Sequence, residues 1–437
     1  MVNEKLVNRV LRRPVFQCLC FVSLMLLFGM FSVEAVDDTG LTVNADNVIG
    51  KISPLVYGAN YGPWALISMD NAPLAEQSGI TFYRFPAGAW GDQHDLHESD
   101  IDMFYAQTHQ WHAQLSISVR LQGGTPEAAA KLVHYANVEK GYNIRYWSIG
   151  NEPNLYKNYS VEQLNEDWRP IAEAMRAVDP TIILMGPEVS QYPPTADPKE
   201  YQAPLREWVR SFLKANGDLD DIVSIHRYPF PKQTNGSVTA ADLRANVTEW
   251  DTLVPDLRSV IKDATGHDLP VALTEVNSNW DFGASITDTP YHAVWWADVL
   301  GRLIRQQVEI VNYWALSAQE SSLGLLSRYN PRPAYYVYLL YKQFGTDLLG
   351  SSSSDQDITI TAAKKDDGSL TLMVVNLAPD SKTVPVALKG FVPSGAAEVW
   401  LLDKDHKAEK IDAQDFSTGS LTLPPESVTL YIVPASK

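Results

Sequence analysis

Short apolar runs alternate with longer amphipathic segments between residues 55 and 315. The apolar runs have the length and the nearly continuous hydrophobic character of strands that are buried on both faces of a sheet. There are eight of them, at residues 55–60, 81–86, 115–121, 145–151, 181–187, 222–228, 270–276 and 310–316. Each gap leaves room for a helix, which is the arrangement of consecutive βαβ units.

The segments between the runs show the periodicity of helices. In residues 240–261 apolar residues recur at steps of three and four, although Pro255 predicts a kink or a division into two helices. Ser160 and Gln163 form the capping box of another helix, which ends before Pro180. Eight strands that alternate with helices favour a closed (β/α)8 TIM barrel over an open, doubly wound sheet.

The pattern changes after the last predicted helix, at residues 334–345, where a serine-rich segment at residues 350–356 is typical of a linker. Six short β-branched runs follow without a helix between them: ITITAA, LTLMVVNLA, TVPVALKG, AEVWLLD, SLTLPP and VTLYIVP. They predict a small antiparallel β-sandwich. The expected fold class is therefore α/β, with a TIM barrel at residues 37–345 and a C-terminal β-sandwich domain at residues 350–437. Residues 37–54 also have an extended pattern and could add a strand to the sandwich.

The N-terminal segment has the pattern of an export signal. A basic start precedes a long apolar run, and small residues then stand at Val33 and Ala35, which predicts cleavage before Val36. The basic residues are Lys5, Arg9, Arg12 and Arg13. A signal peptide at residues 1–35 predicts a secreted or extracytoplasmic protein.

The same apolar run is long enough to span a bilayer, so an uncleaved N-terminal anchor is the alternative. The protein would contact a membrane only in that case. Both cysteines of the chain, Cys18 and Cys20, lie in this segment. Cleavage would therefore leave a mature protein without disulfides or thiol chemistry.

Composition narrows the choice of partners. Of the 437 residues, 45% are hydrophobic and 20% are charged, which is ordinary for a globular chain with one large and one small domain. The formal net charge of −17 argues against nonspecific binding to nucleic acid, and no nucleic-acid partner is expected. The same charge disfavours a strongly polyanionic substrate, while the oligomeric state stays open.

Polar and aromatic side chains stand where the predicted strands end. In a (β/α)8 barrel the reactive residues lie at the carboxyl ends of the strands. The residues at these ends are Asn60, Arg84, Asn151, Glu152, Glu188, His226, Tyr228, Glu275 and Trp314. Two carboxylates that face each other across a barrel mouth, here Glu152 and Glu275, can cleave a glycosidic bond. One protonates the leaving oxygen, while the other attacks the anomeric carbon or activates water.

Two of these strand ends resemble known catalytic signatures. IGNEP, with Glu152, and LTEVN, with Glu275, are similar to the motifs that end strands four and seven in the clan A glycoside hydrolases. YRFPAG, with Arg84, is similar to the strand-two arginine motif of that clan, and IHRY resembles its strand-six His-x-Tyr. Trp314 is similar to the strand-eight aromatic residue. A barrel followed by a β-sandwich resembles families 39, 51 and 79 of the clan.

The resemblance implies a retaining glycosidase that needs no cofactor and acts on an oligosaccharide or polysaccharide. It assigns Glu152 as the general acid/base and Glu275 as the nucleophile of a double displacement. It implies that Arg84 bonds the nucleophile and that Trp314 forms the floor of the sugar subsite. His226 and Tyr228 are the matching strand-six pair.

Elementary electrostatics sets requirements for these roles. The pKa of Glu152 must be raised, by an apolar strand end or a nearby carboxylate, if it is to hold a proton at neutral pH. Glu275 must stay ionised, which Arg84 and Tyr228 can ensure by charge and by hydrogen bonding. Asn151 is placed to donate a hydrogen bond to the sugar 2-hydroxyl.

Other residues have two readings each. Trp64, Trp90 and Trp280 follow strand ends, where an indole can bind the apolar face of a sugar ring or pack under a loop. Glu188 can line the site or lie beside it, whereas Glu249 is expected on a solvated helix face. The histidine pairs His94–His97 and His109–His112 have i, i+3 spacing, but no zinc motif matches and no metal is expected.

Two rival functions stay open. A non-catalytic carbohydrate-binding relative of the same fold would usually lack one of the two carboxylates, and both are present here. A membrane-anchored structural protein rests on the N-terminal apolar run alone. The sequence does not determine the sugar, its anomeric configuration, or whether cleavage is internal or terminal, because the loops after the strands decide these properties.

Overall fold

The computed structural model describes residues 40–195, 197, 202–230, 237–281, 285–318 and 321–436. The predicted signal peptide or anchor at residues 1–35 lies outside these residues. Within the described part of the chain, none of the helices combines the length and the hydropathy that a membrane span requires.

Eight parallel strands close into a barrel in the order β2 to β9, and β9 pairs with β2 to complete the ring. Every strand overlaps the run that predicts it, so the predicted TIM barrel is confirmed. The strands are β2 (Gly58–Asn60), β3 (Phe82–Phe85), β4 (Gln114–Val119), β5 (Tyr146–Ile149), β6 (Ile183–Val189), β7 (Ile222–Arg227), β8 (Val271–Val276) and β9 (Ile310–Tyr313). The first is shorter than expected, because Pro54–Val56 forms a turn of 3-10 helix.

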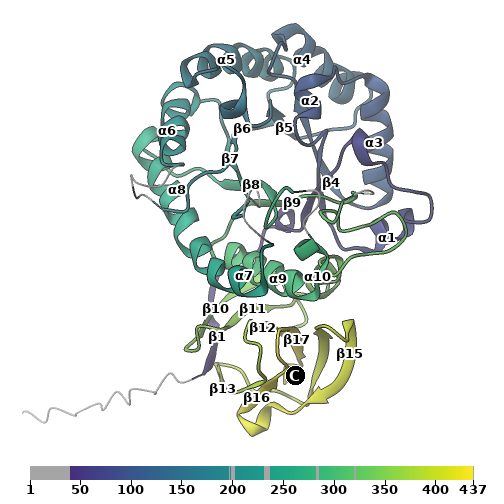
Figure 1. Ribbon diagram of the computed structural model, residues 1–437, viewed down its shortest axis with the longest axis vertical. Helices are drawn as coiled ribbons and strands as arrows, with labels where there is room; N and C mark the ends of the chain where they lie inside the picture. The colour runs from purple at the N-terminus through teal and green to yellow at the C-terminus, as the bar shows by residue number, and fades with distance from the viewer. Residues whose placement is uncertain are drawn as a thin grey trace, which may run out of the picture. The chain divides into compact units, whose positions relative to one another are not determined.

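The described residues contain ten α-helices, and Figure 1 shows the larger ones as a ring around the strands. They are α1 (Ala72–Gln77), α2 (Trp90–Gln93), α3 (Glu98–Gln110), α4 (Pro126–Val133), α5 (Val161–Val178), α6 (Pro204–Asn216), α7 (Ala240–Asn246), α8 (Trp250–Thr265), α9 (Pro290–Arg305) and α10 (Tyr335–Tyr341). The predicted capping box of α5 is confirmed, because Ser160 and Gln163 each accept from the other's backbone N–H. The buried face of α5 carries Leu164, Trp168, Ile171 and Met175 at helical spacing.

The predicted division of residues 240–261 into two helices is confirmed, but it does not lie at Pro255. The two helices divide at the 3-10 turn Val247–Glu249, and Pro255 lies inside α8. Proline removes one backbone donor from the helix. The buried residues Leu253, Val254 and Leu257 flank it and hold this segment against the barrel.

The barrel interior is apolar at one end and polar at the other. A buried cluster near the amino ends of the strands includes Phe82, Met185, Ile222, Ala272 and Ile310. The polar side chains gather at the opposite, carboxyl ends. The packed apolar end therefore fixes the strands whose other ends carry the candidate site.

The second sheet has nine strands in the order β15-β14-β17-β12-β11-β10-β1-β13-β16. All its pairs are antiparallel except β1 with β13. The strands are β1 (Leu41–Lys51), β10 (Asp347–Ser353), β11 (Ile358–Lys364), β12 (Leu370–Asn376), β13 (Lys382–Lys389), β14 (Ala397–Leu402), β15 (Lys407–Gln414), β16 (Ser420–Leu423) and β17 (Ser427–Val433). The predicted antiparallel domain after the barrel is thus confirmed.

Two features of this sheet differ from the sequence-based picture. The serine-rich segment expected as a linker is largely strand β10, because the backbone of residues 350–353 pairs with β1. The pairing of β10 with β11 involves the preceding residues 347–349. Backbone pairing does not depend on side-chain type, so the serines do not prevent it. The edge strand β15 has no predicted counterpart, since it is mostly polar and exposed.

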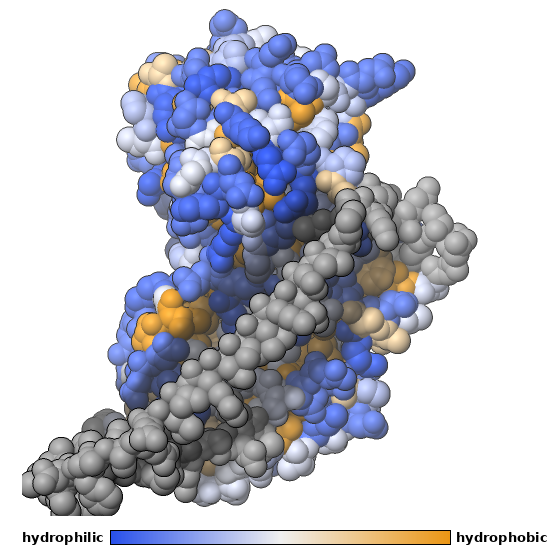
Figure 2. Space-filling model, turned by 90° about the vertical axis from the view of Figure 1, so that its left-hand side faces the viewer, coloured by the Kyte–Doolittle hydropathy of each residue, from blue (hydrophilic) through white to orange (hydrophobic). Residues whose placement is uncertain are grey.

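Barrel and sheet share part of their core. One hydrophobic cluster joins barrel helices to Met373, Val375 and Leu430 of the sheet, while a second cluster lies among the strands of the sheet alone. Arg305 of α9 also donates a 3.1 Å hydrogen bond to the carbonyl of Ile360. Figure 2 shows a face on which hydrophilic residues predominate and hydrophobic residues form small groups.

Candidate active site

The end of β5 turns sharply and presents Glu152. Trp147 and Ile149 are buried in the core, and Gly150 then adopts φ +81°, where an added Cβ would lie 2.7 Å from Leu121. Glu152 itself has φ 49°, a left-handed conformation that is uncommon for residues other than glycine. Its backbone N–H donates to the carbonyl of Glu188 at 2.9 Å, and the 3-10 turn Pro153–Leu155 follows.

The structure brings Glu152 and Glu275 together. One carboxylate oxygen of each lies within 4.8 Å of the other. Glu275 is almost fully buried in β8, whereas the side chain of Glu152 is 20% exposed. One acid is thus embedded in the barrel mouth, and the other is partly exposed to solvent.

Glu275 is held by two donors. Arg84 Nη1 donates to its Oε1 at 2.9 Å, and the hydroxyl of Tyr228 donates to its Oε2 at 2.7 Å. Arg84 is fully buried, and its Nη2 donates to Asn151 Oδ1 at 2.8 Å. The amide nitrogen of Asn151 therefore stays available as a donor.

Asn60 is part of the framework. It is fully buried, and its amide nitrogen donates to the carbonyl of Thr274 at 2.9 Å. Its oxygen accepts from Arg84 at 3.2 Å. Asn60 thus ties β2 to β8 and orients Arg84.

His226 bridges the carboxylates from β7. Its Nδ1 lies 3.0 Å from Glu152 Oε1 and 3.6 Å from Glu275 Oε2, and its Nε2 lies 2.8 Å from Glu188 Oε2. Glu188 is fully buried and also accepts from the hydroxyl of Thr274. Of the two sequence-based readings of Glu188, the geometry matches the one that places it at the site.

In the free protein, the pKa values of Glu152 and His226 are shifted in the directions opposite to those that a proton on Glu152 requires. Burial raises the pKa of Glu152, but the hydrogen bond and charge of His226 outweigh it and hold the pKa below its ordinary value. Burial lowers the pKa of His226, but the charges of Glu275 and Glu152 and the bonds to Glu152 and Glu188 raise it to about 9. These opposite shifts favour a proton on His226 over a proton on Glu152.

Glu275 experiences opposing influences. Burial raises its pKa above the ordinary value, and the charges of His226 and Arg84 oppose that rise. The hydrogen bond from Tyr228 acts in the same direction as these two cations. The negative charge of Glu152 adds to the effect of burial, so these three groups offset only part of the rise and the pKa of Glu275 stays above its ordinary value.

Asp92 is a buried residue of the site that the sequence does not single out. Its carboxylate accepts from the backbone N–H of Asn151 at 2.8 Å and of Leu121 at 2.9 Å, and from the hydroxyl of Tyr156. It therefore joins the loops that follow β3, β4 and β5. It lies in the four-residue helix α2, without distinctive spacing to the other site residues, so nothing in the sequence marks it as one of them.

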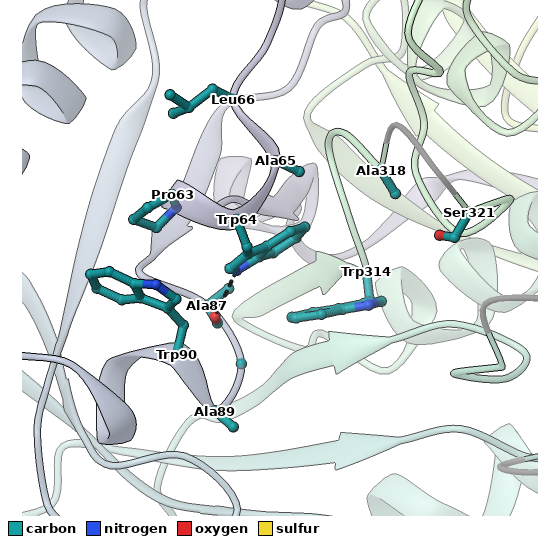
Figure 3. Close-up of a pocket in the computed structure, with 11 residues that line it drawn as sticks. Pro63, Trp64, Ala65, Leu66, Ala87, Ala89, Trp90, Trp314, Ala318 and Ser321 are labelled. Carbon is teal, nitrogen blue, oxygen red and sulfur yellow. Dashed lines mark hydrogen bonds between the residues drawn. The ribbon is translucent and has the colours of Figure 1, made fainter.

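An aromatic pocket of about 800 Å³ lies between the segments that follow β2, β3 and β9 (Figure 3). Trp64, Trp90 and Trp314 line it together with small aliphatic residues and Ser321. The rings of Trp64 and Trp314 stack with centroids 5.2 Å apart, and Trp64 Nε1 donates to the carbonyl of Ala87 at 3.1 Å. We call this cavity the tryptophan pocket.

Trp280 lies outside the tryptophan pocket. It is 38% exposed and its ring meets the ring of Tyr228 edge-on, with centroids 5.6 Å apart. Tyr228 in turn bonds Glu275. Of the predicted aromatic residues, Trp64, Trp90 and Trp314 thus line the tryptophan pocket, while Trp280 covers the tyrosine that holds Glu275.

The expectation for Glu249 is wrong. Its side chain is 16% exposed, and its carboxylate accepts from Arg227 Nε at 2.9 Å and Nη2 at 3.0 Å. The 3-10 turn that carries it packs toward β7 and presents it to this arginine, so it does not lie on a solvated helix face.

The donor set at the carboxylates does not fit a resident metal ion. Among the described residues, Glu152, His226 and Glu275 bring their ligand atoms within 4.8 Å of one another. The histidine pairs His94–His97 and His109–His112 are not part of such a group among these residues. Both oxygens of Glu275 already accept from Arg84 and Tyr228. The nitrogen of His226 that faces the pair lies at hydrogen-bond distance from Glu152. Arg84 and His226 thus supply the positive charge that a metal ion would otherwise supply to these carboxylates.

Known proteins resemble the chain in sequence and in fold. The family model described as glycosyl hydrolases family 39 matches residues 135–377, more than half of the chain, and the model for the D-apionate lactonase C-terminal immunoglobulin-like domain matches residues 356–428. Heparanase of Rattus norvegicus is 26% identical over 306 residues, which are 64% of this chain and 54% of heparanase. Beta-xylosidase of Geobacillus stearothermophilus is 23% identical over 258 residues, which are 54% of this chain and 47% of that protein.

A solved structure extends the likeness to nearly the whole fold. The alpha-L-arabinofuranosidase from Thermotoga maritima matches with a TM-score of 0.71 and 18% identity, over 90% of this chain and 99% of that one. At this identity the match shows the fold alone. The chain spans about half the length of the curated relatives it matches.

Proposed function

The chain belongs to glycosyl hydrolases family 39, and from this premise we propose that it is a glycosidase that hydrolyses oligo- or polysaccharides with retention of configuration. The family match confirms the resemblance to clan A that the strand-end motifs indicate. The separation of Glu152 and Glu275, with oxygens within 4.8 Å, carries the mechanistic part of the proposal. Retaining enzymes hold the two carboxyl groups about 5–5.5 Å apart, whereas inverting enzymes need about 6.5–9.5 Å to admit a water molecule.

In the first step, a carboxylate oxygen of Glu275 attacks the anomeric carbon while Glu152 delivers a proton to the leaving oxygen. The bond from the anomeric carbon to the leaving group breaks, and an ester to Glu275 forms. In the second step, Glu152 takes a proton from water, which attacks the same carbon and releases Glu275. Two inversions at one carbon give net retention.

The surroundings support this division of roles. Arg84 and Tyr228 favour the ionised form of Glu275, as a nucleophile requires. The partly exposed position of Glu152 suits the residue that must reach both the leaving group and water. The free amide nitrogen of Asn151, whose oxygen Arg84 holds, can donate to the sugar 2-hydroxyl.

The tryptophan pocket supports an uncharged sugar as the group bound there. Among the described residues, none of those that line it carries a charge. Indole faces pack well against the apolar faces of sugar rings. The net charge of −17 further disfavours a sulfated chain or a uronate. We accordingly propose a neutral glycan, in a protein exported by its N-terminal segment.

A hydrolysis screen over plant and microbial polysaccharides and aryl glycosides tests this function. Wild type is compared with Glu152→Ala and Glu275→Ala, and the first-formed anomer is identified by proton NMR. Each variant should lose at least about 100-fold in kcat, ~2.7 kcal/mol. Added azide should restore turnover of activated aryl glycosides, with a retained product from Glu152→Ala and an inverted product from Glu275→Ala.

The rival reading is a non-catalytic carbohydrate-binding relative. It predicts that glycans bind to wild type and to both variants with similar affinity and that no substrate is cleaved. Variants that stay within about tenfold of an active wild type, ~1.4 kcal/mol, would contradict the assignment of the two carboxylates.

A further inference from the structure

Glu188 is a third buried carboxylate, and the two-acid mechanism gives it no role. It stands near the end of β6 with φ 57°, a left-handed conformation like that of Glu152. Neither its carboxylate nor the residue as a whole is exposed to solvent. A charged group without access to solvent is costly unless neighbouring groups compensate it, so the contacts of Glu188 indicate what it does.

Glu188 contacts Glu152 by two routes. Its backbone carbonyl accepts the N–H of Glu152 at 2.9 Å, which fixes the turn that presents the acid. Its carboxylate lies 2.8 Å from Nε2 of His226, whose Nδ1 lies 3.0 Å from Glu152 Oε1. The backbone and the side chain of Glu152 are therefore both held, directly or through His226, by the same residue.

The groups around His226 determine how many protons its ring carries. Glu152 faces it from the end of β5, Glu188 from β6 and Glu275 from β8. Arg84 of β3 compensates two of these carboxylates, and the neutral hydroxyls of Tyr228 and Thr274 donate to Glu275 and Glu188. Three carboxylates and one guanidinium leave a surplus of negative charge, which favours a second proton on the imidazole.

We propose that Glu188 is a positioning residue that orients His226 and keeps it doubly protonated, so that Glu152 and His226 together store the proton given to the leaving group. This inference rests on the proposed function. It explains why the pKa of Glu152 is lowered in the free protein although its role requires a proton.

The proton balance follows directly. In the first step the Nδ1–H bond of His226 breaks, its proton passes through the carboxyl group of Glu152, and an O–H bond forms on the departing sugar. The imidazole is then neutral and Glu152 is ionised, ready to act as the base. In the second step the proton removed from water returns to the pair, and the hydroxide portion of that water ends on the sugar.

The charge of Glu188 is tested with Glu188→Gln, which keeps an acceptor oxygen for Nε2–H but removes the negative charge. Loss of the charge makes the stored proton easier to lose, so the basic limb of the kcat/KM profile should move to lower pH by about 1–2 units. At pH values below this limb the variant should keep activity within about fivefold of wild type, because orientation is preserved. Glu188→Ala should lose kcat at every pH, and Glu188→Asp should return the limb toward its wild-type position.

Glu249→Gln is the matched control. It removes a largely buried carboxylate that bonds Arg227, the neighbour of His226 in the chain, but contacts none of the site residues. Its basic limb should coincide with that of wild type, and thermal melting of all variants identifies any that fail to fold. A profile of Glu188→Gln that is lowered equally at all pH values, or that coincides with wild type, would overturn the proposal.

Imidazole NMR provides a readout that needs no substrate. The chain has nine histidines, and the ring signals of His226 are assigned by their absence in His226→Asn. Both ring nitrogens of His226 should be protonated at pH 7 in wild type, and the titration should shift to lower pH in Glu188→Gln. A singly protonated ring in wild type at pH 7 refutes the stored proton even if Glu152 and Glu275 prove essential. If the ring of His226 is doubly protonated but wild type cleaves no glycoside, or does so without needing Glu152 and Glu275, the proposed function is refuted instead.

Discussion

Arg84 Nη1 lies 2.9 Å from Glu275 Oε1, and neither side chain is more than 5% exposed. The same guanidinium reaches Glu188 at 3.3 Å and Asn151 at 2.8 Å. One cation on β3 therefore compensates two buried carboxylates and orients an amide at the barrel mouth. A single side chain thus links the nucleophile to its surroundings.

Arg84→Ala should abolish this compensation. Removing one partner of a buried ion pair leaves uncompensated charge, so the free energy of unfolding should fall by about 3–5 kcal/mol. The kcat/KM should fall at least about 100-fold, because the pKa of Glu275 rises when its cation is lost. Denaturant titration and kinetics measure the two effects. Arg84→Lys keeps a charge and should be less destabilised, and equal losses in both variants would contradict the electrostatic argument.

Tyr228→Phe isolates one hydrogen bond to Glu275. The bond stabilises the ionised form of Glu275, so its loss raises the pKa of that carboxyl group. Because the nucleophile must be ionised, the acidic limb of the kcat/KM profile should move to higher pH. The kcat at the optimum should fall about 10–100-fold. An unchanged acidic limb would show that Tyr228 does not set the ionisation of Glu275.

Asp92→Asn tests the residue that joins three loops. The amide cannot accept all the donors that the carboxylate accepts, so a buried N–H is left without a partner, which costs about 1–3 kcal/mol of stability. Glu152 follows Asn151, so kcat should fall more than KM rises. Asp95→Asn is the control, because the Asp95 side chain is 78% exposed and bonds Arg120. Similar losses in both variants would argue against a role for Asp92.

Trp64→Ala should weaken substrate binding in the tryptophan pocket. The substitution removes the ring that stacks on Trp314 and opens one wall of the pocket. We expect KM to rise about tenfold, ~1.4 kcal/mol, with a smaller change in kcat. Trp400→Ala, in β14 of the second sheet, is the control and should leave KM unchanged. Tryptophan fluorescence during glycan titration gives an independent measure of binding.

His292 makes stability depend on pH. Burial lowers the pKa of His292 to about 3, against an ordinary value of 6.5. Between these values the unfolded chain binds a proton that the folded chain excludes, so stability is complete above pH 6.5 and is lost as the pH falls. The stability advantage of wild type over His292→Phe should therefore shrink by about 2 kcal/mol between pH 7 and pH 5. Denaturant titrations at the two pH values measure it, and a constant difference would mean that the ring has the same pKa in the folded and the unfolded chain.

The hydrophobic pattern was sufficient for the barrel and for the strand ends. Eight apolar runs predict eight parallel strands, because strands buried on both faces must be nearly continuous in apolar residues. The pattern was insufficient where backbone pairing determines the secondary structure or where a neighbouring cation determines the environment of a side chain. The serine-rich β10 pairs with two strands whatever its side chains are, and Glu249 meets Arg227 across a turn that the sequence does not reveal.

By itself, the sequence determined which polar side chains lie at the end of each strand, because the point where an apolar run gives way to polar residues can be read directly from the chain. Tertiary structure alone decided what these side chains meet. Closure of the barrel brings Glu188 into contact with His226, 38 residues away in the chain. It also brings Asp92 into contact with Asn151, 59 residues away. Hydrogen bonds and charge interactions act over a few ångströms of space, and separation along the chain does not specify that distance.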